Sequence, residues 1–207
     1  MHLLPGDAEN RGRMNTINVS SNLHSESIVN GTTDREAHSK RWIAALVQSC
    51  TEKRVGKRLD KMEVENYIPT QMEIHQWSDR KKKVERIVIP MIVFIHTDEM
   101  TERRLRMETF IRKILSFPGQ WKAAVIPDSQ IERLKFMLKH AESQVELMEQ
   151  NLQVGETVRV ARGPLQGLEG EICQVQAGKS LIAIRVDCLG YACVSIDMSD
   201  VEPMASH

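Results

Sequence analysis

Clusters of basic side chains are the residues of this chain best suited to chemistry. One cluster lies in the segment TEKRVGKRLDKME, residues 51–63, and a second is the run RKKK at residues 80–83. Lysine and arginine contacts with phosphates release condensed counterions, so each contact adds salt-sensitive affinity that is independent of base sequence. These cations therefore point to a polyanionic partner.

The net charge of the whole chain conceals this preference, because its 28 basic and 28 acidic side chains cancel. Residues 1–40 hold 4 basic and 5 acidic side chains, and residues 41–140 hold 20 and 13, a net charge of +7. Residues 141–207 hold 4 and 10, a net charge of −6. This asymmetry predicts a polyanionic partner for the central part only.

Residue sets that would indicate an enzyme or a metal site are not apparent in the sequence. It contains no Ser-His-Asp set, paired carboxylates or phosphate-binding loop, and His75 and His96 stand alone. None of the four cysteines lies in a C-x-x-C pair, so we expect buried, reduced thiols at Cys50, Cys173, Cys188 and Cys193. We therefore expect a non-enzymatic protein without a metal or cofactor.

Membrane-spanning and export segments are not predicted. The longest apolar-rich runs, residues 87–95 and 181–186, fall well short of the ~20 apolar residues that a membrane helix needs. The N-terminus has no basic patch followed by an apolar region, which is the pattern of a secretory signal. The chain is accordingly expected to be cytoplasmic, with no membrane partner.

Three segments of different composition must position the cations. Residues 1–40 are rich in Ser, Thr, Asn and Gly and are interpreted as a disordered N-terminal tail. Residues 41–150 mix strand and helix patterns, whereas residues 151–207 alternate apolar and polar positions between closely spaced glycines. Short strands with glycine turns fit a small β-barrel. The predicted class is α+β, a mixed domain followed by an all-β domain.

The basic segment 51–63 is predicted to be an amphipathic helix. Val55, Leu59 and Met62 fall at i, i+4 and i+7, so the cations occupy its outer surface. The apolar run at residues 42–47, just before it, has the length of a buried strand. The helix is therefore expected to rest on a sheet and to present its charges to solvent.

The second basic cluster is predicted to lie in a hairpin turn. Residues 72–77 alternate apolar and polar positions, residues 78–83 form the turn, and residues 84–96 form a second strand. Pro90 inside that strand indicates an edge or a bulge. Trp77 beside the turn either stacks on an unpaired base or caps the sheet.

Two further helices are predicted in the mixed domain. Thr101 is a candidate cap for a short helix over residues 101–110. A long helix begins at Asp128 or Ser129, and its apolar positions repeat at spacings of 3 and 4 as far as Leu152. Its first half is expected to pack on the sheet and its second half to act as a linker or to dock a partner.

The segment VGETVRVARGPLQGLEGEICQV, residues 154–175, resembles a KOW motif, the opening of an SH3-like barrel in transcription-elongation and ribosomal proteins. A strand runs into a Gly-Pro turn, and Gly170 stands where the next strand begins. Glycine is needed there if the backbone has a positive φ or approaches another chain closely.

The mixed domain resembles the N-terminal domain of NusG-family transcription elongation factors. The resemblance rests on RWIAALVQSCTEKRVGKRL, YIPT and RIVIPMIVFIH, and with the KOW segment it covers about residues 41–204. The stretch QWSDRKKKVERIVIPMIVFIH further resembles UpxY-type paralogues, which are RfaH-like antiterminators of surface-polysaccharide loci. Housekeeping NusG has an aromatic-Pro-Gly-Tyr segment where residues 89–92 read Ile-Pro-Met-Ile. We therefore expect a paralogue with an aliphatic polymerase-binding pocket.

The resemblance implies that the N-terminal domain docks on the clamp helices of the largest RNA polymerase subunit and holds the clamp shut. The implied polymerase-binding residues are Tyr67, Pro69, Ile89, Pro90, Ile92, Phe94, Arg103, Arg104 and Arg106. The apolar members are equally compatible with an ordinary core. An exposed apolar patch, by contrast, is a sign of a partner.

Contacts with the non-template DNA strand or a nascent RNA leader are also implied. The corresponding basic residues are Arg54, Lys57, Arg58, Lys61, Arg80, Lys81 and Lys82. In the family the KOW domain binds ribosomal protein S10 or Rho, and the matching positions are Leu165, Leu168 and Leu189, which are compatible with barrel core as well.

The resemblance therefore implies a monomeric factor that binds elongating RNA polymerase, suppresses pausing and termination, and acts at a surface-polysaccharide operon. The alternative is an RNA- or ribosome-binding KOW protein without a polymerase role. The net charge of −6 over residues 141–207 favours protein contacts over RNA there. Its period-two pattern favours a barrel over a helical hairpin.

Overall fold

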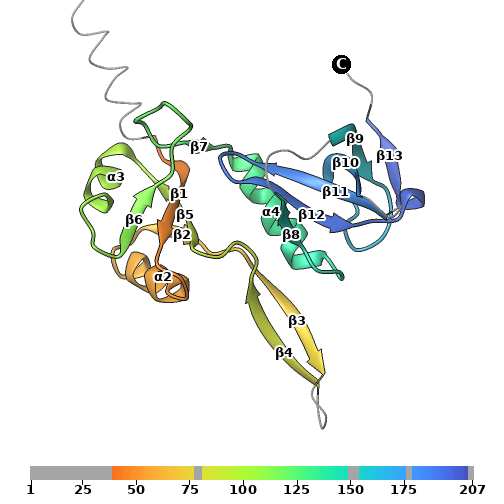
Figure 1. Cartoon of the computed structure of the whole chain (residues 1–207), viewed down its shortest axis with the longest axis horizontal. Coiled ribbons are helices and arrows are strands. Elements are labelled where there is room, and N and C mark those ends of the chain that lie inside the picture. The colour runs from red at the N-terminus through yellow and green to blue at the C-terminus, as the bar shows by residue number, and fades with distance from the viewer. Residues whose placement is uncertain (1–38, 77–80, 149–153, 176–178, 205–207) are drawn as a thin grey trace, which may run out of the picture. The chain divides into compact units, whose positions relative to one another are not determined.

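The computed structural model describes residues 39–76, 81–148, 154–175 and 179–204. Their fold is of the predicted α+β class, with three antiparallel sheets and few helices (Figure 1). The tail predicted at residues 1–40 lies almost entirely outside the described residues. No helix among the described residues is long and apolar enough to span a bilayer.

The first sheet is built around the predicted strand at residues 42–47, which is confirmed as β1 (Arg41–Val47). Its strand order is β2-β5-β1-β6, and β7 also pairs with β1. The bounds of the other strands are β2 Glu65–Tyr67, β5 Ile92–Thr97, β6 Ile111–Ile114 and β7 Val125–Ile126. Alternate residues of β1 enter two separate hydrophobic clusters, which explains why the strand is apolar on both faces.

Helices cover both faces of this sheet. The predicted basic helix is confirmed as α2 (Glu52–Lys61), whose Val55 and Leu59 pack in the cluster that contains Ile43. Helix α4 (Asp128–His140) contributes Ile131 and Leu134 to the other cluster. Successive residues of β1 therefore face α2 and α4 alternately.

The short helix α3 (Glu99–Leu105) starts earlier than predicted. Its N-cap is Asp98, whose Oδ1 accepts the backbone N–H of Thr101 at 2.8 Å. The proposed Thr101 cap was wrong because the helix begins at Glu99, so Thr101 lies inside its first turn and receives the cap from Asp98.

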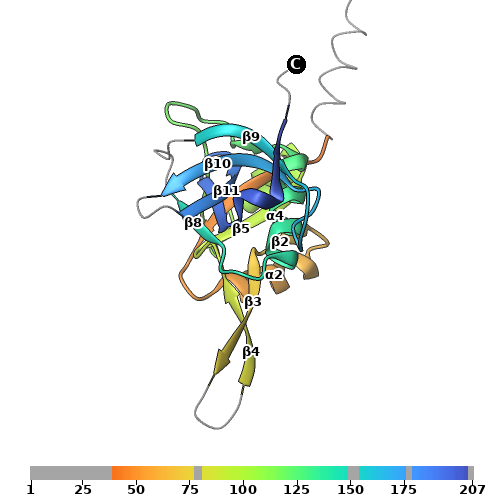
Figure 2. The same ribbon diagram turned by 90° about the vertical axis from the view of Figure 1, so that its right-hand side faces the viewer.

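The basic hairpin forms a two-stranded sheet of its own, β3 (Thr70–Gln76) with β4 (Lys81–Ile87), and extends away from the first sheet (Figures 1 and 2). The prediction of one strand over residues 84–96 was wrong, because the chain turns at residues 88–91 before β5. Met91 has a φ of 64°, and its N–H donates to Glu52 Oε1 at 2.7 Å. This turn buries Ile89 and Ile92 in one cluster, which a straight strand could not do.

The prediction that a long helix ends the first domain was also wrong. Helix α4 ends at His140, and Ala141 is extended, with φ −64° and ψ 126°. The segment 141–145, here called the connector, leads into β8 (Glu146–Met148), which pairs with β12 (Gly190–Ser195) of another sheet. Val145 is fully buried, so the apolar spacing marked a buried position correctly but not the backbone that carries it.

The third sheet has six strands in the order β13-β9-β10-β11-β12-β8, and fits the predicted small β domain. Besides β8, its strands are β9 Val154–Val160, β10 Glu169–Val175, β11 Lys179–Val186, β12 Gly190–Ser195 and β13 Val201–Pro203. A Cβ on Gly170 would lie 2.7 Å from the carbonyl oxygen of Ala183, so close backbone approach explains this glycine. β8 lies before residue 151, where the sequence predicts that this domain begins.

Helix α4 also contacts the third sheet. One hydrophobic cluster contains Phe94 of β5, Leu134 of α4 and Ile184 of β11. At its rim, Gln130 Oε1 accepts the backbone N–H of Asp187 at 2.8 Å, and Arg133 pairs with Glu169 at 3.1 Å.

Candidate functional site

The outer face of α2 carries the predicted nucleic-acid-binding cations. Burial of Val55 and Leu59 leaves the opposite face of the helix in solvent. The exposed cations on that face are Lys53, Arg54, Lys57, Arg58 and Lys61. The four predicted members of this set are therefore all accessible on one helix.

Beside α2 lies a small cavity surrounded by guanidinium groups. Arg54 and Arg58 of α2 line it together with Arg112 of β6. The remaining lining residues are Gln48, Thr51, Val55, Thr109 and Phe110. The Arg58 guanidinium lies 5.3 Å from the centre of the Phe110 ring. None of the described residues that line the cavity is acidic, so it favours an anion, with an aromatic face beside it.

Arg112 was missed by the sequence prediction. β6 was not predicted, although its pattern of buried Ile111 and Ile114 flanking exposed Arg112 and Lys113 is visible in the sequence. Four residues are too short a window for periodicity alone to distinguish a strand from a loop.

The hairpin is tied to α2 at its root. Lys53 Nζ pairs with Glu85 Oε2, and Glu85 also accepts a hydrogen bond from Thr70 at 2.8 Å. These two contacts hold the pKa of Glu85 below its usual value. Lys82 and Lys83 are exposed on β4, whereas Arg80 and the side chain of Lys81 lie outside the described parts.

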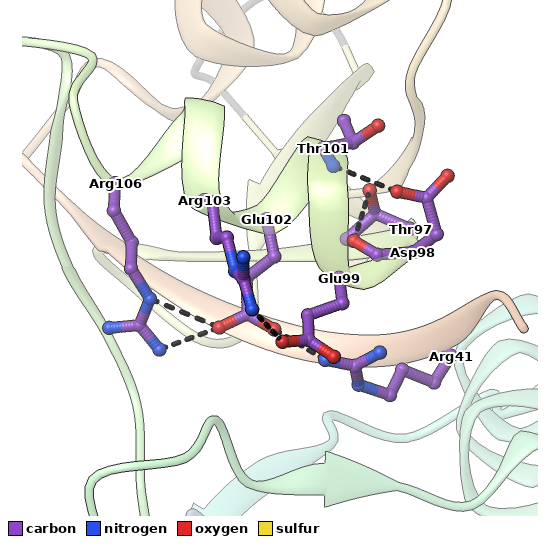
Figure 3. Close-up of polar contacts among 8 residues, drawn as sticks. All are labelled: Arg41, Thr97, Asp98, Glu99, Thr101, Glu102, Arg103 and Arg106. Carbon is purple, nitrogen blue, oxygen red and sulfur yellow. Dashed lines mark hydrogen bonds and ion pairs between the residues drawn. The ribbon is translucent and has the colours of Figure 1, made fainter. Parts of the chain in front are cut away.

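Arg103 of α3 and Arg106 at its C-cap are engaged in ion pairs within the chain (Figure 3). Arg103 pairs with Glu99, and Arg106 Nη2 lies 2.6 Å from Glu102 Oε1. Arg41 Nη2 lies 2.7 Å from the other oxygen of Glu102, which is 5% exposed. A partner of Arg103 or Arg106 would have to compete with these carboxylates. The third predicted arginine, Arg104, is exposed.

The predicted polymerase-binding residues divide into a buried and an accessible group. The buried group is Pro69, Ile89, Ile92 and Phe94. Tyr67 is half-buried and stacks on Phe94 with ring centres 6.1 Å apart, and burial raises its pKa above the usual value. Pro90 is exposed at the turn. In this conformation the buried residues are core, and of the non-arginine members only Tyr67 and Pro90 can touch a partner directly.

A lysine covers part of this region. Lys135 Nζ of α4 lies 5.0 Å from the centre of the Trp42 ring and 5.5 Å from that of Tyr67. Trp42 in turn stacks on His96, with ring centres 4.9 Å apart. The same ammonium group lies 2.9 Å from Glu132 Oε1, and the cation–π arrangement stabilises α4 on the sheet.

The predicted KOW contact residues are mostly interior. Leu165 is 7% exposed and Leu168 is 3% exposed, and Leu189 packs half-buried against the same cluster. Leu165 lines a cavity of about 400 Å³ together with Arg162 and Asp197. Its lining includes the acidic residues Glu142, Asp197 and Asp200.

The cysteines differ in exposure. Cys173 and Cys193 are buried and Cys188 is half-buried, but Cys50 is exposed, contrary to the prediction. Burial raises the pKa of Cys173 and Cys188 to about 11 and that of Cys193 to about 12. These thiols stay protonated at neutral pH. Among the described residues, no three His, Cys, Asp or Glu side chains gather as a metal site.

The helix-covered antiparallel sheet and the six-stranded sheet give this chain an α+β fold. Residues 40–135 match the family model described as "Transcription termination factor nusG". The chain therefore carries a NusG family domain, which spans β1 to most of α4 and holds the arginine-lined cavity.

Similarity to NusG proteins extends beyond that domain. The chain is 25% identical over 180 residues to the transcription termination/antitermination protein NusG of Staphylococcus carnosus, and 26% identical to that of Staphylococcus epidermidis. Each comparison covers 82% of this chain and 98% of the relative. A structure entitled "Domain interaction in Thermotoga maritima NusG" is 17% identical, covers 80% of this chain and 98% of its own, and has a TM-score of 0.45. The predicted NusG resemblance is confirmed, and the UpxY-type specialisation remains a prediction.

Proposed function

We propose that this protein is a transcription antitermination factor that binds elongating RNA polymerase through its NusG family domain and nucleic acid through α2. The observation that carries the proposal is the cavity formed by Arg54, Arg58 and Arg112 inside the family-matched segment. The similarity to NusG proteins over 82% of the chain supports a role in transcription.

The nucleic acid is the non-template DNA strand or a nascent RNA leader. A phosphate in the cavity accepts hydrogen bonds from the guanidinium groups, which are fixed donors that remain charged at every physiological pH. The Phe110 ring beneath Arg58 holds this guanidinium beside the cavity through a cation–π contact. Binding is accordingly salt-dependent, with each phosphate contact to a single strand adding about 0.7 to the slope of affinity against salt.

Polymerase contact involves the accessible residues Tyr67 and Pro90, which the buried residues Ile89, Ile92 and Phe94 support from beneath. The surface of α3, with Arg104 exposed, forms a second contact on the opposite wall of the cleft. Bridging the two walls stabilises the closed clamp by differential binding and so disfavours the paused state.

The last domain is proposed to bind a protein, with ribosomal protein S10 and Rho as the candidates. The net charge of −6 over residues 141–207 and the acidic residues around the cavity beside Leu165 favour a basic protein surface. The aliphatic sequence at residues 89–92 supports a specialised paralogue, for which we propose a surface-polysaccharide operon as the target.

The test is transcription by purified bacterial RNA polymerase on a template with a pause and a terminator. The chain is expected to increase read-through, and Pro90→Asp is expected to abolish co-precipitation with core polymerase. Pro118→Asp, at another exposed proline of the same domain, is the matched control and should bind normally. A wild-type chain that binds RNA but neither core polymerase nor elongation complexes would favour the alternative of a KOW protein without a polymerase role.

A further inference from the structure

The β3–β4 hairpin exposes two large apolar side chains on one face. Met72 is 60% exposed and Ile74 is 66% exposed. They lie two residues apart on β3, so they share a face of the ribbon. Their cross-strand partners are Glu85 and Lys83, which stand on the same face. The ribbon therefore presents an apolar pair with a lysine opposite it.

The other face of the hairpin is already occupied. Gln71 is 4% exposed, and its Nε2 donates to the carbonyl oxygen of Ser143 at 2.8 Å. Arg86 Nη2 donates to the carbonyl oxygen of Val145 at 2.8 Å and its Nε bonds Glu73. Because these contacts bind that face to the connector, the Met72 face is the one left for a partner.

The Met72 face is continuous with the basic surface of α2. Lys53 and Glu85 join the helix to this side of the hairpin root. Lys53, Lys57 and Lys61 follow at intervals of four along α2, and all three are exposed. The apolar pair is thus bordered by lysines on α2 and on β4, with Lys83 nearest in register.

We propose that this surface binds duplex DNA, with the ribbon lying against a groove and Met72 and Ile74 acting as an apolar wedge at a base step. Two-stranded ribbons fit DNA grooves, and inserted apolar side chains kink a duplex by roughly 20–90°. Charge complementarity selects the partner, because Lys83 beside the wedge and the exposed lysines of α2 at the hairpin root offer cations to the phosphates that border a groove. The proposal rests on the nucleic-acid contact proposed above but needs no polymerase.

The experiment uses the full chain and an end-labelled duplex of roughly 20–30 base pairs, and follows affinity by anisotropy and bending by energy transfer. The wild-type chain should bind and bend the duplex. Met72→Ser with Ile74→Ser should lower affinity about tenfold and abolish bending while keeping the salt slope. Met107→Ser with Met198→Ser, which changes two exposed side chains elsewhere, is the matched control and should behave as wild type.

A second pair of variants tests the cations separately. Lys57→Gln with Lys83→Gln should reduce the salt slope by about 0.9 for each lost phosphate contact. Unchanged affinity and bending in the Met72 and Ile74 variant overturns the proposal. So does an equal loss of single-strand and duplex binding in that variant, or a loss that appears only in polymerase binding, which would assign the face to a protein. A chain that binds core polymerase but no duplex refutes this inference and leaves the proposed function standing.

Discussion

Gln71 Oε1 accepts a hydrogen bond from the backbone N–H of Val145 at 2.9 Å, between residues 74 positions apart in the chain. The amide nitrogen of the same side chain donates to the carbonyl oxygens of Ala141, at 3.4 Å, and Ser143. One buried glutamine thus forms hydrogen bonds with three backbone groups of the connector after α4 and joins the connector to the hairpin. Buried backbone groups need such partners, because leaving one unpaired costs roughly 1–3 kcal/mol.

Replacing Gln71 with leucine should therefore destabilise the protein. The variant leaves the Val145 N–H and the Ser143 carbonyl without this partner. We expect a loss of about 2–4 kcal/mol in the free energy of unfolding by urea. Gln120→Leu, at an exposed loop position, is the control and should change it by less than about 0.5 kcal/mol. Equal stability of the two variants would contradict the assigned role of Gln71.

Glu102 and Glu99 offer a matched pair on one helix (Figure 3). Glu102 is buried between Arg41 and Arg106, whereas Glu99 pairs with Arg103 at the surface. Glu102→Gln should lower the free energy of unfolding by roughly 1–3 kcal/mol. This loss is smaller than for a fully buried ion pair, because both arginines are partly exposed to solvent. Glu99→Gln should cost about 0.5 kcal/mol or less. Thermal unfolding of the two variants measures the difference.

Substitution of Gly170 by alanine should disrupt the third sheet. The added Cβ would lie 2.7 Å from the Ala183 carbonyl oxygen, and this backbone atom cannot move aside cheaply. A cost of about 1–3 kcal/mol is expected from overpacking. Gly155→Ala, where the nearest atom is the Ile172 carbonyl oxygen at 3.1 Å, should cost less. An equal or greater loss for Gly155→Ala, read from amide exchange in β10 and β11, would be inconsistent with this geometry.

Thiol alkylation should separate the cysteines by burial. Cys50 is exposed and should react first with iodoacetamide at pH 8. Cys173 and Cys193 should react only after unfolding, because burial holds their pKa values at about 11 and about 12 and keeps the thiolate fraction low. Mass spectrometry of native and urea-treated protein gives the order. Rapid modification of Cys193 in native protein would refute its burial.

The same pKa shifts predict how stability depends on pH. A folded-state pKa raised above the unfolded value of about 8.5 favours the protonated thiol in the native state. The contribution of each thiol to the free energy of unfolding is therefore fully present below about pH 8.5. It is lost as the pH rises toward about 11 for Cys173 and about 12 for Cys193. Denaturation midpoints at pH 8 and pH 10 should fall less in Cys193→Ala than in wild type.

The sequence by itself determined the elements whose apolar period reflects their own burial. Residues 42–47 are apolar throughout because β1 lies between two hydrophobic clusters. The spacing of Val55 and Leu59 fixed the buried side of α2 and hence the exposed position of its cations. The short period-two strands between glycines predicted the β domain, and Gly170 marks a close approach of two strands.

Tertiary structure decided where those patterns are interrupted. The spacing that leads from α4 to Val145 is compatible with a continuous helix, but Gln71 and Arg86 bind the extended connector instead. The turn before β5 likewise depends on a residue far away in the chain. Glu52 of α2 accepts a hydrogen bond from the backbone N–H of Met91 in this turn. Arg112 joins Arg54 and Arg58 only because β6 pairs beside β1. Periodicity reports which positions are buried, whereas hydrogen bonds between residues far apart in the chain select the backbone that buries them.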